Sequence, residues 1–205
     1  NFSRIGSVAI TKNIIQALGG KVRSHGVRTL FINATELNKF ELPVELSDKT
    51  RATTMFAGPL LARFGKALLP VPGGDKLGSR PLQRHFNGLK QMNVKVDFAN
   101  GAYILHTDKL IGTEYCFPKN THTGTETLIM AAVCAKGKTI LKNAAEEPEV
   151  DDLIEFLNKM GAKINRENRT INIQGVDLDS LHPTIHSVVP DRNEAVTYAC
   201  AALGT

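Results

Sequence analysis

The segment KMGAKINRENRTINIQGVDL, residues 159–178, shows the pattern that decides the fold of this chain. It leaves a helical stretch at a glycine, enters a short strand, turns through polar residues and returns in a strand that alternates polar and apolar residues. ALGGKVRSHGVRTLFINATEL (17–37) and QMNVKVDFANGAYILHTDKL (91–110) have the same form. A lysine holds the equivalent position in each segment: Lys21, Lys95 and Lys163. The pattern predicts a chain built from a repeated unit.

A second element repeats upstream of two of these segments. FGKALLPVPGG (64–74) parallels KGKTILKNAAE (136–146), so that Gly65-Lys66 aligns with Gly137-Lys138. We therefore expect each unit to supply one further strand before its strand pair.

The helical segments fall into two classes. PLQRHFNGLKQM (81–92) and EPEVDDLIEFLNKMG (147–161) carry apolar residues on one face only, which is typical of surface helices. Three others are rich in alanine and apolar on nearly all sides, and such helices belong inside: residues 52–64, 124–135 and 193–204. The unit is thus a buried helix, a strand, a surface helix and a strand pair. We predict an α/β fold in which three units close around three central helices, with a two-layer α/β sandwich as the alternative.

Composition limits the function classes. The chain has 205 residues, 42% of them hydrophobic, and a net charge of +5 that favours anionic ligands. No block of like charges is typical of a nucleic-acid arm, and no apolar run reaches the roughly 18–20 residues of a membrane span. The three cysteines form no CxxC pair, which indicates a reducing cytoplasm, with Cys134 and Cys200 buried. No metal-binding or cofactor motif is present.

The stretch PVPGGDKLGSRPLQRH, residues 70–85, is the strongest candidate site. A glycine-rich loop that leads into a helix presents backbone N–H groups at the positive end of the helix dipole, which suits an anion. Pro81 fits the first helical position, and Arg80 can bind a phosphate or carboxylate through its guanidinium. Arg84 and His85 fall about one turn further on. A simple turn, with Asp75 as its turn residue, is the alternative.

Two other segments have a similar form. In KNTHTGTET (119–127), polar residues precede a buried helix that we expect to begin near Thr125. In PDRNE (190–194), Asp191 is predicted to cap a helix. Taken alone, His85 and His122 are more often surface or capping residues than catalysts.

Several runs together resemble the enolpyruvyl transferases: RATTMFAGPLLARFGKALLPVPGGDKLGSRPLQRHFNGL (51–89), NAAEEPEVDDLIEFLNKMGAKI (143–164) and VVPDRNEA (188–195). The resemblance covers nearly the whole chain and is strongest to the branch that acts on UDP-N-acetylglucosamine. It implies an inside-out α/β barrel, here a single domain over residues 1–205, and a second domain across a cleft. Because the sequence begins and ends within a unit, we expect that second domain to be absent from this chain.

The resemblance also implies a reaction and its residues. The enolpyruvyl group of phosphoenolpyruvate would pass to the 3-hydroxyl of UDP-N-acetylglucosamine, with release of phosphate, in peptidoglycan synthesis. Asp75 takes the place of the loop's proton donor, which is a cysteine in many members, so fosfomycin resistance is expected. Arg80 would meet phosphate, with Arg51 on the same surface. The remaining positions match the segments that hold the sugar nucleotide: Pro81, Leu82, Gln83, Arg84 and His85 for the uridine end, and Asn120, Thr121, His122, Thr123 and Gly124 for the diphosphate and sugar.

This sequence departs from the family pattern at a few of these positions. Gln83 and Arg84 replace an acid and an apolar residue, Asn120 replaces a lysine, and His122 replaces a small residue. Two alternatives stay open: a 3-phosphoshikimate carboxyvinyltransferase, and a non-catalytic or RNA-end-binding protein made from the same repeat. With its second half missing, the chain alone is expected to be inactive. We expect no cofactor, metal, nucleic acid or membrane partner.

Overall fold

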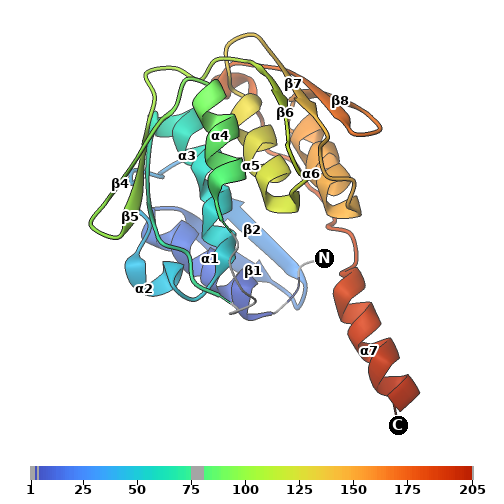
Figure 1. The fold of residues 1–205 in the computed structure, drawn as a ribbon. Coiled ribbons are helices and arrows are strands. Elements are labelled where there is room, and N and C mark those ends of the chain that lie inside the picture. The colour runs from blue at the N-terminus through green and yellow to red at the C-terminus, as the bar shows by residue number, and fades with distance from the viewer. Residues whose placement is uncertain (1–2, 4, 75–80, 205) are drawn as a thin grey trace.

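The computed structural model describes residue 3 and residues 5–74 and 81–204. Its helices are α1 (Gly6–Ala17), α2 (Val44–Ser47), η1 (Arg51–Phe56), α3 (Ala57–Phe64), α4 (Gln83–Gln91), α5 (His122–Ala132), α6 (Pro148–Lys159), η2 (Leu178–Ser180) and α7 (Arg192–Gly204). Its strands are β1 (Lys21–His25), β2 (Thr29–Asn33), β3 (Lys66–Pro70), β4 (Lys95–Ala99), β5 (Ala102–His106), β6 (Glu114–Cys116), β7 (Lys138–Lys142), β8 (Lys163–Glu167) and β9 (Thr170–Gln174). The α/β fold class is confirmed (Figure 1).

The predicted repeat appears as three antiparallel hairpins. Strand β1 pairs with β2, β4 with β5 and β8 with β9, and the aligned lysines Lys21, Lys95 and Lys163 each begin the first strand. Each pairs with the last residue of the returning strand. Helices α1, α4 and α6 each precede one hairpin, so the unit recurs as expected from the sequence.

The additional strand of the repeat is also present in two units. Strand β3 pairs antiparallel with β5, and β7 pairs antiparallel with β9, which gives the orders β3-β5-β4 and β7-β9-β8. Gly65 and Gly137, just before these strands, have φ of 65° and 94°, a left-handed backbone that favours glycine. The short strand β6 extends the last sheet by pairing parallel to β7.

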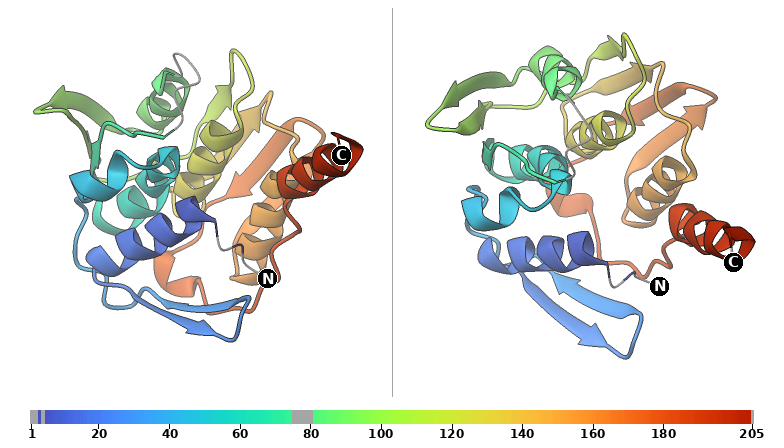
Figure 2. Two further views of the ribbon diagram at one scale, coloured as in Figure 1. Left: turned by 90° about the horizontal axis from the view of Figure 1, so that it is seen from below. Right: turned by 60° about the horizontal axis from the view of Figure 1, so that its bottom comes forward.

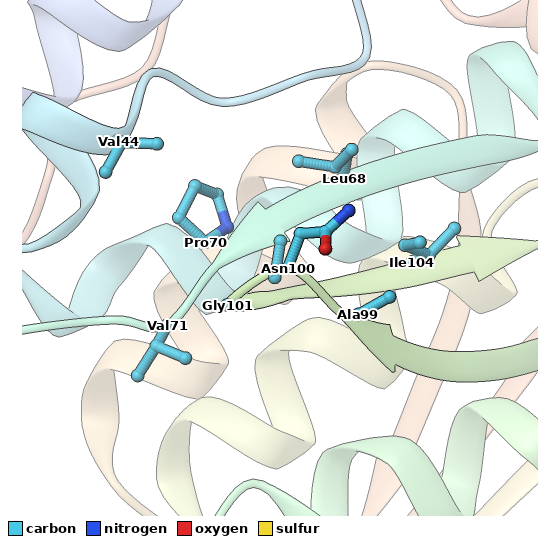
Figure 3. A pocket seen from close by; sticks show the side chains of 9 residues that line it. Val44, Leu68, Pro70, Val71, Ala99, Asn100, Gly101 and Ile104 are labelled. Atoms are coloured by element: carbon cyan, nitrogen blue, oxygen red, sulfur yellow. The ribbon is translucent and has the colours of Figure 1, made fainter.

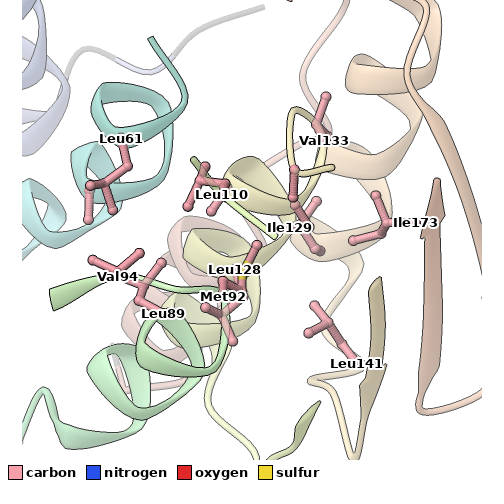
Figure 4. Close-up of a cluster of buried hydrophobic side chains, with 14 of the residues drawn as sticks. Leu61, Leu89, Met92, Val94, Leu110, Leu128, Ile129, Val133, Leu141 and Ile173 are labelled. Atoms are coloured by element: carbon pink, nitrogen blue, oxygen red, sulfur yellow. The ribbon is translucent and has the colours of Figure 1, made fainter. Parts of the chain in front are cut away.

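Helix α5 lies at the centre of the molecule. Leu128, Ile129, Ala131 and Ala132 of α5 are fully buried, as the apolar composition of this segment predicts. Around them gather side chains from α3, α4 and two strands of the last sheet (Figure 4): Leu61, Leu89, Met92, Leu141 and Ile173. The core therefore surrounds a single helix and includes side chains of α1, such as Ile14, as well as those of the second and third units.

Close contact with α5 depends on two glycines. A Cβ on Gly58 of α3 would lie 2.6 Å from the carbonyl oxygen of Thr127, and a Cβ on Gly88 of α4 would lie 2.2 Å from Leu128 Cδ1. Because contacts this short do not occur, α3 and α4 approach α5 as closely as they do only because both positions lack a side chain.

The segment predicted as one helix over 52–64 is divided. Residues 51–56 form the 3-10 helix η1, and α3 follows at Ala57. The hydroxyls of Thr53 and Thr54 each donate to a carbonyl three residues earlier, a pattern that suits the tighter turn.

A segment without regular structure, residues 181–191, runs alongside α6 in the opposite chain direction. We call this segment the strap. Two contacts attach the strap to α6: His182 N–H donates at 2.9 Å to the carbonyl of Met160, just after the helix, and His186 Nε2 lies 2.8 Å from Asp152 Oδ1. A third contact comes from Arg192, the first residue of α7, whose Nε donates to Glu149 Oε1 at 2.9 Å.

Helix α7 differs from the prediction. The segment 193–204 was expected at the centre, but α7 projects from the molecule and buries none of its residues (Figures 1 and 2). Leu203 is 89% exposed, and Cys200, predicted to be buried, is exposed as well. An alanine-rich helix needs a packing surface to be buried, and no described part of this chain packs against the apolar residues of α7. Among the described residues the sheets also stay separate, with none closed into a barrel.

Candidate active site

The N-termini of three helices, α4, α5 and η1, lie near one another. Helices α4 and η1 both pack against α5, and each begins within a segment singled out from the sequence. The N–H groups of a first helical turn have no partner within the helix, and they point outward at the positive end of the helix dipole. The arrangement is suited to bind an anionic ligand along the three N-termini.

Helix α4 begins later than predicted. Its first residue is Gln83 and Leu82 is the capping residue, so Pro81 lies before the helix and not at its first position. The Leu82 carbonyl accepts from the N–H groups of His85 and Phe86, which starts the turn without Pro81. The side chains of this turn divide by exposure: Gln83 is exposed and bonds Asn87 at 2.8 Å, whereas Leu82 and His85 are buried.

Helix α5 begins earlier than predicted. It starts at His122 and not near Thr125, because the Thr121 hydroxyl caps the first turn by accepting from the Gly124 N–H at 3.4 Å. A Cβ on Gly124 would lie 2.4 Å from Thr121 Cγ2, so the cap requires glycine there. Asn120 is exposed just before the cap. The candidate residues 122–124 therefore form the first turn of the helix instead of a loop.

His85 connects these two N-termini. Its Nε2 lies 3.0 Å from Thr123 Oγ1, and its side chain is almost wholly enclosed. Burial, together with the positive charges of Arg51 and Arg84, lowers the pKa of His85 to about 4. Arg51, the first residue of η1, thus lies close to His85, in one of the two segments predicted to bind the sugar nucleotide.

His122 has the opposite electrostatic surroundings. The carboxylate of Glu126, one turn further along α5, raises the pKa of His122 despite the opposing effect of burial. His122 Nε2 and Glu126 Oε1 are 3.3 Å apart, without the alignment of a hydrogen bond. Glu126 is only 8% exposed and was missed in the sequence, although its spacing of four residues from His122 on a helix was a usable signal.

The base of the glycine-rich loop is fixed in place. Gly73 N–H donates to the Ser47 carbonyl at 3.0 Å, and a Cβ on Gly73 would overlap the Asp48 carbonyl. Gly74 has φ of 98° and lies against the backbone of Arg51. Close approach and a left-handed backbone therefore explain these two glycines. The predicted catalytic residues Asp75 and Arg80 lie outside the described residues.

The groove of about 420 Å³ beside β3 offers a different chemistry (Figure 3). Its lining comes from α2, the end of β3 and the turn between β4 and β5, with Val44, Pro70 and Asn100 among the residues. Among the described residues, none of the side chains that line it is charged. Within the described ranges we find no group of three His, Cys, Asp or Glu side chains that could hold a metal ion, and no helix with the length and apolarity to cross a membrane.

The sequence profile of the EPSP synthase (3-phosphoshikimate 1-carboxyvinyltransferase) family matches residues 1–205. The chain belongs to this family of enolpyruvyl transferases, as its sequence resemblance predicted. It is 41% identical over 203 residues to UDP-N-acetylglucosamine 1-carboxyvinyltransferase of Hydrogenovibrio crunogenus, which covers 98% of this chain and 48% of that protein. The protein of the same name from Geotalea uraniireducens is 43% identical over 193 residues, 94% of this chain and 46% of that protein.

Solved structures show the same fold. The enolpyruvyl transferase NikO from Streptomyces tendae aligns with a TM-score of 0.83 at 23% identity, over 96% of this chain and 47% of that one. An EPSP synthase from Acinetobacter baumannii aligns with a TM-score of 0.65 at 14% identity, over 83% of this chain and 40% of that one. The chain spans about half the length of the curated relatives it matches.

Proposed function

We propose that this chain is one domain of an enzyme that transfers the enolpyruvyl group of phosphoenolpyruvate to the 3-hydroxyl of UDP-N-acetylglucosamine. The observation that carries the proposal is the 40–43% identity, over nearly the whole chain, to relatives named for this reaction. Their name favours the sugar nucleotide over 3-phosphoshikimate as acceptor. A catalytic role is likewise favoured over a non-catalytic or RNA-binding one.

The site residues support the binding of an anionic substrate. The N–H groups at the starts of α4 and α5 would bind the sugar nucleotide, with the uridine end along Pro81–Arg84 and the diphosphate and sugar along Asn120–Gly124. Arg51 and Arg80 would neutralise the phosphate of phosphoenolpyruvate. Arg51 is suited to this role because it lies against the base of the loop that carries Arg80.

The chemistry needs a proton donor and a leaving group. Asp75, in its acid form, would protonate the methylene carbon of phosphoenolpyruvate while the sugar 3-oxygen bonds to the neighbouring carbon and loses its proton to a base. The resulting tetrahedral intermediate then loses phosphate from that carbon and a proton from the new methyl group, which restores the vinyl ether. An aspartate can donate at neutral pH only if a desolvated cleft raises its pKa.

The complete enzyme would have a second domain across the cleft. We propose that each domain is an inside-out barrel with three central helices, of which α3 and α5 are two. The enzyme would act in the cytoplasm in peptidoglycan synthesis, and thereby in cell shape and division. It would need no cofactor, and it would bind neither nucleic acid nor membrane.

The test compares the 205-residue chain with the protein from the full reading frame. We expect the full-length protein to release phosphate from phosphoenolpyruvate only when UDP-N-acetylglucosamine is present, and the chain alone to release none. Arg80→Ala in the full-length protein should cost about 1.5–3 kcal/mol of transition-state stabilisation, as kcat/KM measures. Phosphate release that depends on shikimate 3-phosphate instead would favour the other acceptor, and release by the chain alone would contradict the two-domain proposal.

A further inference from the structure

One side-chain contact joins the starts of α4 and α5, the two segments proposed above to bind the sugar nucleotide. His85 Nε2 lies 3.0 Å from Thr123 Oγ1, although the two residues are 38 positions apart in the sequence. Both atoms belong to the first turns of their helices. The contact is therefore at the mouth of the site and not deep in the core.

The surroundings of His85 keep its ring uncharged. The ring is 4% exposed, and the guanidiniums of Arg51 and Arg84 disfavour a further positive charge beside them. A neutral imidazole has one donor nitrogen and one acceptor nitrogen, and a threonine hydroxyl can complement either of them. Thr123 is the side-chain partner of the ring, through Nε2, and the buried Nδ1 atom has no side-chain partner among the described residues.

A second contact, one turn deeper, fixes the distance between α4 and α5 but not the relative orientation of their first turns. Gly88 of α4 packs directly against Leu128 of α5, and this apolar contact sets how closely the two helix axes approach. Apolar packing is not directional, whereas a hydrogen bond fixes relative orientation. Among the described residues, the His85–Thr123 contact is thus a directional bond that links one N-terminus directly to the other.

We propose that His85 is a positioning residue for the sugar nucleotide, which acts through Thr123 to hold the first turn of α5 in register with that of α4. The inference rests on the proposed function. It assigns His85 an indirect role, through its contact with Thr123, whereas the sequence resemblance had suggested direct contact with the substrate. A site whose binding groups are already in place loses less conformational entropy when it binds, so the contact strengthens substrate binding.

The experiment measures KM for each substrate separately in the full-length enzyme. Thr123→Val removes the hydroxyl and keeps the side-chain volume, and we expect it to raise KM for UDP-N-acetylglucosamine about 3- to 10-fold. The KM for phosphoenolpyruvate should change less than about twofold. The kcat should change by a smaller factor than the KM for the sugar nucleotide. Thr123→Ser should restore the KM, because it restores the hydroxyl.

A double variant and a matched control complete the kinetic test. His85→Leu should raise the same KM, and His85→Leu combined with Thr123→Val should be no worse than the worse single variant, because both remove one contact. Thr127→Val is the control, since Thr127 is buried on the same helix but donates only to the Thr123 carbonyl, at 2.8 Å. Additive effects, equal rises in both KM values, or an effect of Thr123→Val no larger than that of Thr127→Val would overturn the proposal.

A spectroscopic readout separates this proposal from the proposed function. Nitrogen-15 NMR of histidine side chains in the 205-residue chain should show a neutral His85 ring at pH 6–8, and Thr123→Val should shift its Nε2 resonance while Thr127→Val does not. An unshifted Nε2 resonance overturns the contact itself. A shifted resonance in a protein whose full-length form transfers no enolpyruvyl group overturns the proposed function, and the positioning role with it.

Discussion

At the scale of single residues, His85 makes folding stability depend on pH. Its pKa falls from 6.5 to about 4 on folding, so the folded state binds fewer protons than the unfolded state between these values. Stability is therefore lost as the pH falls from about 6.5 to about 4, by on the order of 3 kcal/mol. Urea unfolding across this range should show a smaller loss for His85→Gln than for the unchanged chain. His25→Gln, at an exposed position of β1, is the control and should retain the full loss.

His122 affects the pH dependence of folding stability in the direction opposite to that of His85. The Glu126 carboxylate raises its pKa, so the stabilising contribution of this ion pair is fully present below pH 6.5 and is lost as the pH rises through the higher folded pKa. The two histidines of one site thus respond to pH with opposite signs, because burial and two arginines lower the pKa of His85 whereas Glu126 raises that of His122 against the effect of burial.

A second residue-scale prediction concerns Asp75. Fosfomycin inactivates members of the family by alkylating the loop cysteine, which reacts as a thiolate. A carboxylate is a much poorer nucleophile but can still donate a proton, so we expect the full-length enzyme to resist the drug and Asp75→Cys to become sensitive. Residual activity and intact mass after incubation with fosfomycin and the sugar nucleotide measure this. An adduct on the unchanged enzyme, or resistance of an active cysteine variant, would show that the role assigned to Asp75 is wrong.

At the scale of elements, the packing of α3 on α5 depends on Gly58. Alanine there would place its Cβ 2.6 Å from a backbone carbonyl and 2.9 Å from the Ala131 nitrogen, and backbone atoms in a packed core cannot move aside easily. We expect Gly58→Ala to destabilise the chain by about 1–3 kcal/mol in urea unfolding, despite the better helix propensity of alanine. Gly6→Ala in α1, where nothing lies within 4 Å, is the control and should be neutral or slightly stabilising. Equal effects at both positions would contradict this account of the packing.

At the scale of the whole molecule, α7 contributes little to the fold of the rest. It buries no residue, and its Arg192 ion pair with Glu149 is exposed, a kind of contact that is worth at most about 1 kcal/mol. Removal of residues 192–205 should therefore change the free energy of unfolding by less than about 1 kcal/mol. The urea midpoint and the hydrogen-exchange protection of α5 measure this. A large loss of protection in α5 would mean that α7 packs on the core in solution.

The local elements of this protein could be predicted from short stretches of its sequence. The repeated strand pairs, the lysines that begin them, the amphipathic α6 and the Asp191 cap of α7, whose Oδ1 accepts from the Asn193 N–H at 2.8 Å, follow from short-range periodicity and capping chemistry. The family, and with it the candidate residues, followed from motif spacing. These features depend on residues that are close together in the chain, and their pattern can therefore be read from the sequence.

How the helices meet could not be predicted from the sequence and depends on the packing of the folded chain. That α7 lies outside while α5 lies at the centre could not be read from composition, since both are apolar and their burial depends on which surface is available to cover them. The pKa of His85 is lowered by its burial and by Arg51, and the pKa of His122 is raised by Glu126. The His85–Thr123 contact joins residues 38 positions apart. Electrostatic and hydrogen-bond effects act over a few ångströms in space, and the fold, not the spacing in the sequence, sets those distances.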